Sequence, residues 1–135
     1  MKYIRKLAWA WWVVTLAMAG CAAAPEQRID KRSDQEIVAE KSKQRWKALL
    51  AGDLKSAYEL VSPAGRSVLT YEGYKNSLKP GFWKDARVNK VVCASPELCE
   101  VRLEIEYEYA GRRTKTPFAE RWIKQDSNWW FLLER

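Results

Sequence analysis

Three cysteines have the clearest potential for chemistry in this 135-residue chain, and two of them lie close together in its C-terminal half. Five residues, including Pro96, separate Cys93 from Cys99, and apolar, strand-like sequence flanks the pair. This arrangement favours a disulfide across the base of a short hairpin. The alternatives are a reactive dithiol, which usually has two intervening residues, and half of a zinc site. Because the chain contains no histidine to complete such a site, we expect a structural disulfide and neither metal nor cofactor.

The third cysteine, Cys21, ends a different pattern at the N-terminus. Basic residues come first, an apolar stretch covers residues 7–18, and two small residues precede the cysteine. This is the order of a cleavable export signal, and the apolar stretch is shorter than the ~20 residues of a membrane-spanning helix. Residues 16–21 resemble a bacterial lipobox, with Met18 where that motif usually has leucine. The resemblance implies cleavage before Cys21 and attachment of lipid, including acyl chains such as palmitate.

The sequence after Cys21 is small and polar, which indicates a tether between a membrane and a folded domain. We therefore assign residues 1–20 to a signal peptide, 21–32 to a lipidated tether and 33–135 to one domain. In Gram-negative lipoproteins, aspartate directly after the lipidated cysteine resembles a retention signal for the inner membrane. Ala22 occupies that position here, which implies transport to the outer membrane on its periplasmic side. The expected location is the cell envelope.

Charge restricts the partners of the mature chain. The first 20 residues carry three of the 24 basic residues and none of the 17 acidic ones, so their removal lowers the net charge from +7 to +4. A mild positive excess favours anionic neighbours such as phospholipid headgroups. The envelope location argues against nucleic acid as a partner. The absence of histidine removes the commonest general base and any serine–histidine–aspartate triad.

Helical sequence opens the predicted domain. A capping box at Ser33 and Glu36 predicts the start of a helix that ends at Gly52. Residues 53–61 predict a second helix with an N-cap at its first residue, and residues 70–78 predict a third.

The hydrophobic period changes from helix to strand after residue 81. We expect strands over residues 87–93, 100–109, 116–124 and 129–133. The second is the clearest, because apolar residues alternate strictly with charged residues that are nearly all acidic. The last is almost fully apolar, which predicts a central position covered on both faces. Basic cross-strand partners for the acidic face are available at Arg87, Lys90, Arg113 and Lys115.

The order of these elements predicts an α+β fold, with two or three N-terminal helices packed on a curved four-stranded antiparallel sheet. Residues 45–58 resemble the opening of the nuclear-transport-factor-two-like superfamily, in which a helix ends in Gly-Asp and leads into Ala-Tyr. Residues 120–129 resemble its closing hairpin, with Asp-Ser in place of the usual Asp-Gly turn. The resemblance implies a cone-shaped fold with a pocket between the helices and the concave face of the sheet.

The superfamily includes isomerases, dehydratases, ligand-binding proteins and proteins without catalytic activity, so the resemblance fixes no reaction. An enzyme would resemble ketosteroid isomerase, which places a carboxylate base in an apolar pocket with an oxyanion donor. The candidate base is Glu120, and the candidate donors are Tyr58, Tyr74 and Tyr107. The alternative is that Glu120 pairs with an arginine such as Arg102 and that the tyrosines are half-buried with hydrated hydroxyls.

A binding function fits the sequence better than catalysis. The aromatic residues that are candidates for a pocket or an exposed patch are Trp46, Tyr58, Tyr107, Tyr109, Trp122 and Trp130. The alternative is that they fill the core of a small domain. The basic segment 111–115 either contacts headgroups or anionic glycan or is a solvated hairpin tip. We expect a non-enzymatic lipoprotein that binds an envelope protein or a small apolar ligand, with accessory roles in an envelope assembly and dimer formation both left open.

Overall fold

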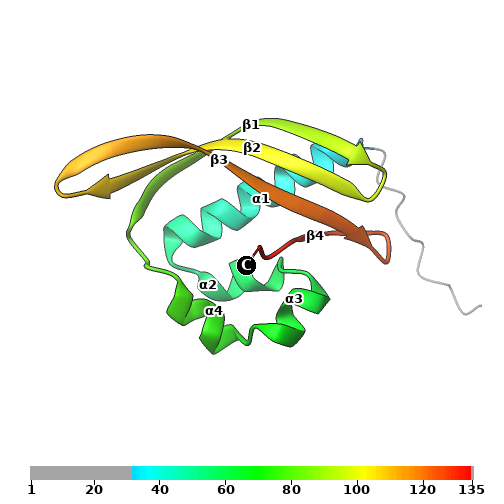
Figure 1. Ribbon diagram of the computed structural model, residues 1–135, viewed down its shortest axis with the longest axis horizontal. Coiled ribbons are helices and arrows are strands. Elements are labelled where there is room, and N and C mark those ends of the chain that lie inside the picture. The colour runs from blue at the N-terminus through cyan, green and yellow to red at the C-terminus, as the bar shows by residue number, and fades with distance from the viewer. Residues whose placement is uncertain (1–31, 135) are drawn as a thin grey trace, which may run out of the picture. The chain divides into compact units, whose positions relative to one another are not determined.

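The computed structural model describes residues 32–134. The expectations for the signal peptide, Cys21, Ala22 and most of the tether therefore lie outside the described residues. Helices come first and strands follow, as Figure 1 shows. The helices are α1 (Asp34–Ala51), α2 (Leu54–Glu59), α3 (Pro63–Val68) and α4 (Tyr71–Ser77). The strands are β1 (Trp83–Ser95), β2 (Leu98–Tyr109), β3 (Arg112–Gln125) and β4 (Asn128–Phe131).

The first helix begins and ends where the sequence predicts. The hydroxyl of Ser33 accepts a hydrogen bond from the backbone N–H of Glu36, and the Glu36 carboxylate accepts one from the backbone N–H of Ser33. This reciprocal capping box satisfies two donors that a helix N-terminus leaves without partners. Gly52 ends α1 with a φ of 76°, in the left-handed region that glycine adopts without strain.

Helix α3 was not predicted. The sequence predicted that the second helix ends at residue 61, but Ser62 and Pro63 begin a further helix there. The Ser62 hydroxyl accepts a hydrogen bond from the backbone N–H of Gly65 at 3.1 Å, and Pro63 occupies the first helical position. Proline suits that position because its missing N–H would have no partner inside the helix.

The sheet is antiparallel throughout, with the strand order β1-β2-β3-β4. Both long strands flanking β2 begin earlier than predicted, β1 at Trp83 and β3 at Arg112. Ion pairs join the acidic outer residues of β2 to two of the predicted basic partners, at 3.2 Å between Arg113 and Glu106 and at 3.3 Å between Lys115 and Glu104. The charged face of β2 is therefore neutralised largely within the sheet.

Strand β4 is an edge strand, so the predicted central position was wrong. Among the described strands, only β3 pairs with it. The residues before and at the start of α3 cover its other side: the backbone N–H of Phe131 donates to the carbonyl of Leu60 at 2.8 Å, and that of Ser62 donates to the carbonyl of Phe131 at 2.9 Å. The apolar character of β4 reflects burial beneath helices rather than between strands, because Trp129 and Phe131 both belong to the core.

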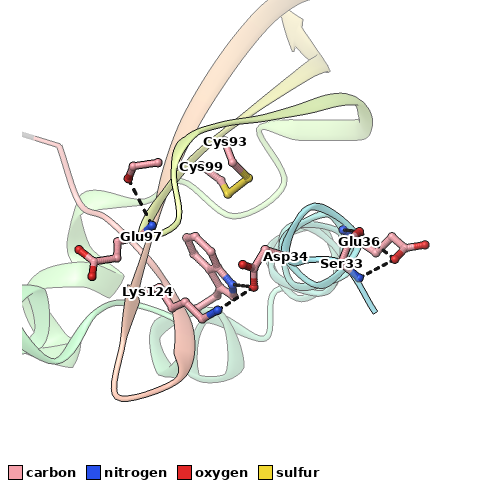
Figure 2. Close-up of a disulfide and its surroundings, with 9 residues drawn as sticks. Ser33, Asp34, Glu36, Cys93, Glu97, Cys99 and Lys124 are labelled. Atoms are coloured by element: carbon pink, nitrogen blue, oxygen red, sulfur yellow. Dashed lines mark hydrogen bonds and ion pairs between the residues drawn. A yellow bond between two sulfur atoms is a disulfide. The ribbon is translucent and has the colours of Figure 1, made fainter. Parts of the chain in front are cut away.

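A disulfide joins Cys93 to Cys99, the pair for which the sequence predicts a bridge. The two residues face one another across β1 and β2, with their Cα atoms 3.9 Å apart, and Cys99 is fully buried. Figure 2 shows the bond and, near it, Asp34 at the start of α1. The carboxylate of Asp34 accepts a hydrogen bond from the ammonium group of Lys124. The bridge closes the β1–β2 hairpin beside the place where α1 meets the sheet.

Helix α1 lies against the sheet and contacts β1, β2 and β4 (Figure 1). The apolar core between these layers contains residues from the helices and from the inner face of each strand. None of the helices in the described part of the chain is long and apolar enough to cross a bilayer.

Candidate functional site

Glu120 is the centre of a buried polar cluster on the inner face of β3, where only 2% of the residue is exposed. Its Oε1 accepts hydrogen bonds from the hydroxyl of Ser42 and, at 3.1 Å, from the indole Nε1 of Trp122. Its Oε2 accepts from the Nη1 of Arg45 at 2.9 Å and from the Nε1 of Trp46 at 3.3 Å. Two oxygens of one carboxylate thus receive four donors.

The local structure explains why these donors converge. Ser42, Arg45 and Trp46 are spaced i, i+3 and i+4 along α1, so they share one helix face. That face packs on the sheet, and all three residues are buried. Trp122 follows Glu120 by two positions on β3 and therefore points to the same side of the sheet. One helix and one strand supply the whole cluster.

The cluster leaves Glu120 little capacity for further chemistry. An ionised carboxylate offers about four lone-pair sites, and each can accept one hydrogen bond. All of these are engaged by the donors described above. The guanidinium of Arg45 also lies over the ring of Phe131, with 3.7 Å between its Cζ and the ring centroid. The ion pair is thereby enclosed by ring faces and by indole N–H groups.

A cavity of about 290 Å³ lies beside the ion pair. Arg45 and Glu120 form part of its wall, and Tyr74 and Ser77 contribute from α4. The other lining residues are mainly apolar: Leu78, Phe118, Ala119, Phe131, Leu132, Leu133 and Glu134. The cavity is thus apolar over most of its surface, with polar groups concentrated around Arg45.

Two residues that line this cavity, Arg45 and Tyr74, each have a deeply buried polar atom. Among the described residues, the buried side-chain atoms without a partner are the Nε of Arg45 and the hydroxyl of Tyr74. Burial raises the pKa of Tyr74, and the nearby guanidinium of Arg45 acts in the opposite direction. The Tyr74 hydroxyl therefore keeps its proton at neutral pH and can donate as well as accept a hydrogen bond. Native proteins rarely leave such groups unpaired, because each costs about 1–3 kcal/mol.

The structure brings together only some of the predicted catalytic candidates. Glu120 and Tyr74 line the same cavity. Tyr58 instead donates its hydroxyl proton to the carbonyl of Leu69 at 2.7 Å. Tyr107 stacks on Phe82 with ring centroids 5.1 Å apart. These contacts give Tyr58 and Tyr107 structural partners away from Glu120.

Glu120 pairs with an arginine, as the alternative to a catalytic role expected, but the arginine is Arg45 and not Arg102. Arg102 pairs with Glu100 on the outer side of β2, with 2.8 Å between Nε and Oε1, while Arg45 on α1 supplies the guanidinium for Glu120. Arg45 and Ser42 were not singled out as site residues by sequence. The available signal was that these polar residues occupy the same helical face as Trp46, where apolar residues are the rule.

The aromatic candidates for binding do not form one patch. Trp46 and Trp122 are buried and donate to Glu120. Trp130 is half-buried on β4, where Lys41 and Arg66 approach its ring at 5.9 and 5.4 Å from the centroid. The exposed candidate is Tyr109, at 72% exposure near the tip of the β2–β3 hairpin. Most of the predicted aromatic set therefore serves the core.

Comparison with known proteins relates this architecture to solved structures. An uncharacterised protein described as NTF-2 like, from Shewanella oneidensis, superimposes with a TM-score of 0.56 and 14% identity, covering 72% of this chain and 93% of its own. The domain has the nuclear-transport-factor-two-like fold. The family resemblance seen in residues 45–58 and 120–129 thus agrees with the three-dimensional arrangement of the nuclear-transport-factor-two-like domain.

Two proteins described as containing a SEC-C motif also superimpose on this domain. The one from Psychrobacter arcticus has a TM-score of 0.60 and 17% identity over 75% of this chain, which spans 60% of that protein's length. The one from Rhodopseudomonas palustris has a TM-score of 0.57 and 14% identity, covering 69% of this chain and 73% of that one. No protein-family model and no curated protein matches the sequence. At these identities the likeness shows the fold alone.

Proposed function

We propose that this chain is an envelope lipoprotein whose nuclear-transport-factor-two-like domain binds a small ligand and catalyses no reaction. One observation supports this best: a largely apolar cavity is lined by Arg45 and Tyr74, beside a carboxylate whose lone pairs are all occupied. Apolar cavities with a few convergent polar groups are the usual form of small-molecule sites.

The occupied lone pairs of Glu120 favour binding over acid–base catalysis. A general base must come within hydrogen-bonding reach of the proton that it removes and must have a lone pair to accept it. Glu120 would first have to release one of four donors in a buried site, and an unpaired buried donor costs about 1–3 kcal/mol. The carboxylate therefore fits a structural role, in which it fixes Arg45 at the cavity wall.

The membrane anchor rests on different support. Residues 16–21 resemble a lipobox, and the Cys93–Cys99 disulfide fits an exported protein, because disulfides persist mainly in oxidising compartments. A single acyl chain gives only reversible membrane binding, whereas two or more hold a protein stably, since each buried methylene contributes ~0.8 kcal/mol. Residues 21–32 would span at most roughly 40 Å if fully extended, which limits how far the domain stands from the bilayer.

Mass spectrometry of the protein purified from its own membrane tests the anchor. We expect an N-terminal peptide that begins with acylated Cys21, and we expect Cys21→Ala to remain unprocessed. Density-gradient separation of the envelope should place the wild type in the outer-membrane fraction of a Gram-negative host, and Ala22→Asp should shift it toward the inner membrane. An unacylated, intact N-terminus in the wild type would overturn this part of the proposal.

Extraction of the purified protein with organic solvent, followed by mass spectrometry, tests ligand binding. We expect a small molecule in the wild-type extract that is lost from Leu78→Trp, because the larger side chain fills part of the cavity that Leu78 lines. Leu50→Trp is the matched control, since Leu50 lies on α1 with 36% exposure and does not line the cavity. Identical extracts from wild type and Leu78→Trp would contradict a ligand in this cavity.

An isomerase-like enzyme is the second candidate, because Glu120 and Tyr74 do line one cavity. Such an enzyme would exchange the α-protons of a bound ketone with solvent deuterium, as NMR would detect. We expect no exchange above the buffer rate. Exchange that disappears in Glu120→Gln but persists in Glu100→Gln, a carboxylate on the outer side of β2, would favour the enzyme.

A further inference from the structure

We propose that one surface patch of the anchored domain contacts the headgroups of anionic phospholipids. This docking patch consists of four side chains from α1, α3 and β4: Lys41, Arg66, Val68 and Trp130. The inference rests on the membrane anchor proposed above. It adds the orientation of the domain on the membrane and the kind of lipid that the domain contacts.

Two cations flank the indole ring of Trp130. The Nζ of Lys41 lies 5.9 Å from the ring centroid, and the Cζ of Arg66 lies 5.4 Å from it. Among the described residues, neither cation forms an ion pair, although most of the basic residues on β3 do. Burial lowers the pKa of Lys41, because its ammonium group is less fully hydrated than in water. An anion beside these two groups would supply a counter-charge that the described part of the domain does not.

An exposed aliphatic side chain and an apolar hollow lie beside the cations. Val68, the last residue of α3, is 65% exposed, more than the other large aliphatic side chains in the described part of the chain. Val68 and Ile123 line a hollow of about 380 Å³ whose lining is mainly apolar. Ile123 pairs with Trp130 across β3 and β4, so the hollow adjoins the indole. Tryptophan beside apolar side chains, with lysine and arginine around it, is typical of surfaces at the membrane interface.

The docking patch lies close to the point where the tether enters the domain. Asp34, in the first turn of α1, accepts a hydrogen bond from the indole of Trp129 at 3.0 Å, and Trp130 is the next residue. Lys41 lies two turns beyond Asp34, or ~10 Å along the same face of α1. A tether over residues 21–32 would span up to roughly 40 Å, which leaves the docking patch within reach of the headgroups.

The charges around the docking patch favour anionic lipid. Two nearby carboxylates, those of Asp34 and Glu134, each form an ion pair with a basic residue of β3. Helix α3 contains no acidic residue, and Asp126 adds one negative charge in the turn before β4. The two cations of the docking patch therefore exceed the unpaired acid beside them. Each such cation strengthens attachment to an anionic membrane surface about fivefold.

The tip of the β2–β3 hairpin is a second basic and aromatic surface, but it suits this role less well. Arg113 and Lys115 already pair with Glu106 and Glu104. The register places this tip at the end of β3 opposite to Ile123, and Figure 1 shows the two ends on opposite sides of the domain. The tip therefore lies away from the start of α1, whereas the docking patch lies near it.

Paramagnetic broadening in nanodiscs tests which surface meets the lipid. The processed protein is placed at one copy per nanodisc of phosphatidylglycerol and phosphatidylcholine, with a gadolinium chelate on a few headgroups. The probes are the indole N–H signals, and Trp130→Phe identifies the signal of Trp130. We expect the Trp130 signal to lose most of its intensity and the Trp83 signal to keep it, because the register places Trp83 at the opposite end of the sheet. Nanodiscs of phosphatidylcholine alone should cause a much smaller loss at Trp130.

Removal of the two cations tests the contribution of charge. Lys41→Gln/Arg66→Gln should lower the ratio of docked to undocked domain about 25-fold, at about fivefold for each cation. Lys79→Gln/Arg112→Gln is the matched control, because it removes the same charge from exposed positions outside the docking patch and should dock like the wild type.

Substitution of the exposed aliphatic residue tests the apolar contact. Val68→Asp should abolish the broadening at Trp130, because a charge would replace carbon at the lipid surface, whereas Val68→Leu should retain it. Unchanged positions of the signals from the buried indoles of Trp46 and Trp122 show that each variant keeps its fold.

The outcomes separate this inference from the proposed anchor. An acylated protein whose Trp130 signal is broadened no more than that of Trp83 would keep the anchor and overturn the docking patch. Equal broadening in neutral and anionic nanodiscs, or equal losses in the two double variants, would also overturn it. Broadening that appears only with two copies per nanodisc would assign the surface to contact between copies and overturn it. A protein without acyl chains that fails to stay on the nanodiscs would overturn both the anchor and the inference.

Discussion

Two carboxylates join α1 to the sheet through similar kinds of partner, a basic side chain and indole N–H groups, but in different surroundings. At the start of the helix, one oxygen of Asp34 accepts from Lys124 Nζ at 2.9 Å and from the indole Nε1 of Trp129 at 3.0 Å. Glu120, which lies on β3 opposite a later part of α1, also accepts from a cation and from indole N–H groups, but it has four donors and almost no exposure. The side chain of Asp34 is 37% exposed.

The difference shows how burial changes the contribution that an ion pair makes to the stability of the fold. Water competes for the Asp34 pair and screens it, so such pairs contribute little to stability, usually about 0–1 kcal/mol. Water does not reach the Arg45–Glu120 pair, so both charges lose their hydration when the protein folds. Removing one partner leaves the other charge buried and unpaired, which is strongly destabilising. A buried pair is therefore fragile to single substitutions, whereas an exposed pair tolerates them.

Removing the buried carboxylate should have the largest effect. Glu120→Ala leaves the guanidinium of Arg45 buried without its counter-ion and leaves three further donors unpaired. We expect a loss of about 3–5 kcal/mol in the free energy of unfolding, measured by urea denaturation. Glu100→Ala removes an exposed carboxylate from the outer side of β2 and should cost less than about 1 kcal/mol. Equal losses in the two variants would contradict the contrast between buried and exposed pairs.

Replacing both charges together should recover much of that loss. In the double variant Arg45→Met/Glu120→Leu, apolar side chains of similar size remove the buried charges at the same time. Such replacements are often neutral or stabilising, so we expect the double variant to be at least about 2 kcal/mol more stable than Glu120→Ala. Urea denaturation of both variants side by side gives the difference. A double variant as unstable as the single one would mean that the ion pair itself supplies the stability.

Removing the buried hydroxyl of Tyr74 should raise the free energy of unfolding, whereas removing the Glu120 carboxylate lowers it. Tyr74→Phe deletes a buried donor that lacks a partner in the unliganded protein and keeps the ring in place. We expect unfolding to require about 1 kcal/mol more free energy, measured by urea denaturation without ligand. Tyr58→Phe is the control of opposite sign, because it removes the hydrogen bond to Leu69 and should destabilise by about 1 kcal/mol. Destabilisation by Tyr74→Phe would indicate that its hydroxyl already has a partner.

Replacing the exposed carboxylate of Asp34 should change the stability least, and the size of the change should depend on pH. The hydrogen bond from Lys124, followed by that from Trp129, lowers the pKa of Asp34 in the folded state. A lowered folded pKa gives stability that is present above the pKa of the unfolded chain, about 3.9, and is lost as the pH falls through the folded value.

Asp34→Asn should therefore be less stable than the wild type at pH 7, by less than about 1 kcal/mol, and the two should converge as the pH falls through the lowered pKa of Asp34 in the folded state. Thermal unfolding across this pH range measures the difference. Added salt should shrink it, because salt screens exposed charges more than buried ones. A difference that persists at pH 2.5 would show that Asp34 acts through something other than its charge.

Local signals made the fold predictable in outline. The hydroxyl of Ser33, the glycine at position 52 and the alternation along β2 each act on neighbouring residues, so the sequence alone reveals them. Helix α3 was missed because a serine followed by proline ends one helix as readily as it begins another. The apolar run of β4 was misplaced because hydrophobicity reports burial and does not report whether strands or helices provide it.

The site was less predictable because its contacts are distant in sequence. Glu120 was a candidate and Tyr74 was among the candidate donors, but the ion pair joins residues 75 positions apart. No local pattern in the sequence connects a strand carboxylate to one of the chain's many basic residues. The buried face of α1 carried the available clue, since Ser42 and Arg45 occupy positions where a helix normally presents carbon to the core.

The segment that covers β4 also bears on how the protein behaves when many copies are crowded together. A sheet edge with free N–H and C=O groups can recruit strands from other molecules and start aggregation. Residues 60–62 bond to the N–H and C=O groups of Phe131 on β4, and at the opposite edge three irregularities in register and several charged side chains disturb β1. If the protein is concentrated on a membrane surface, as we propose, these features of its own chain would hinder edge-to-edge polymerisation of neighbouring copies.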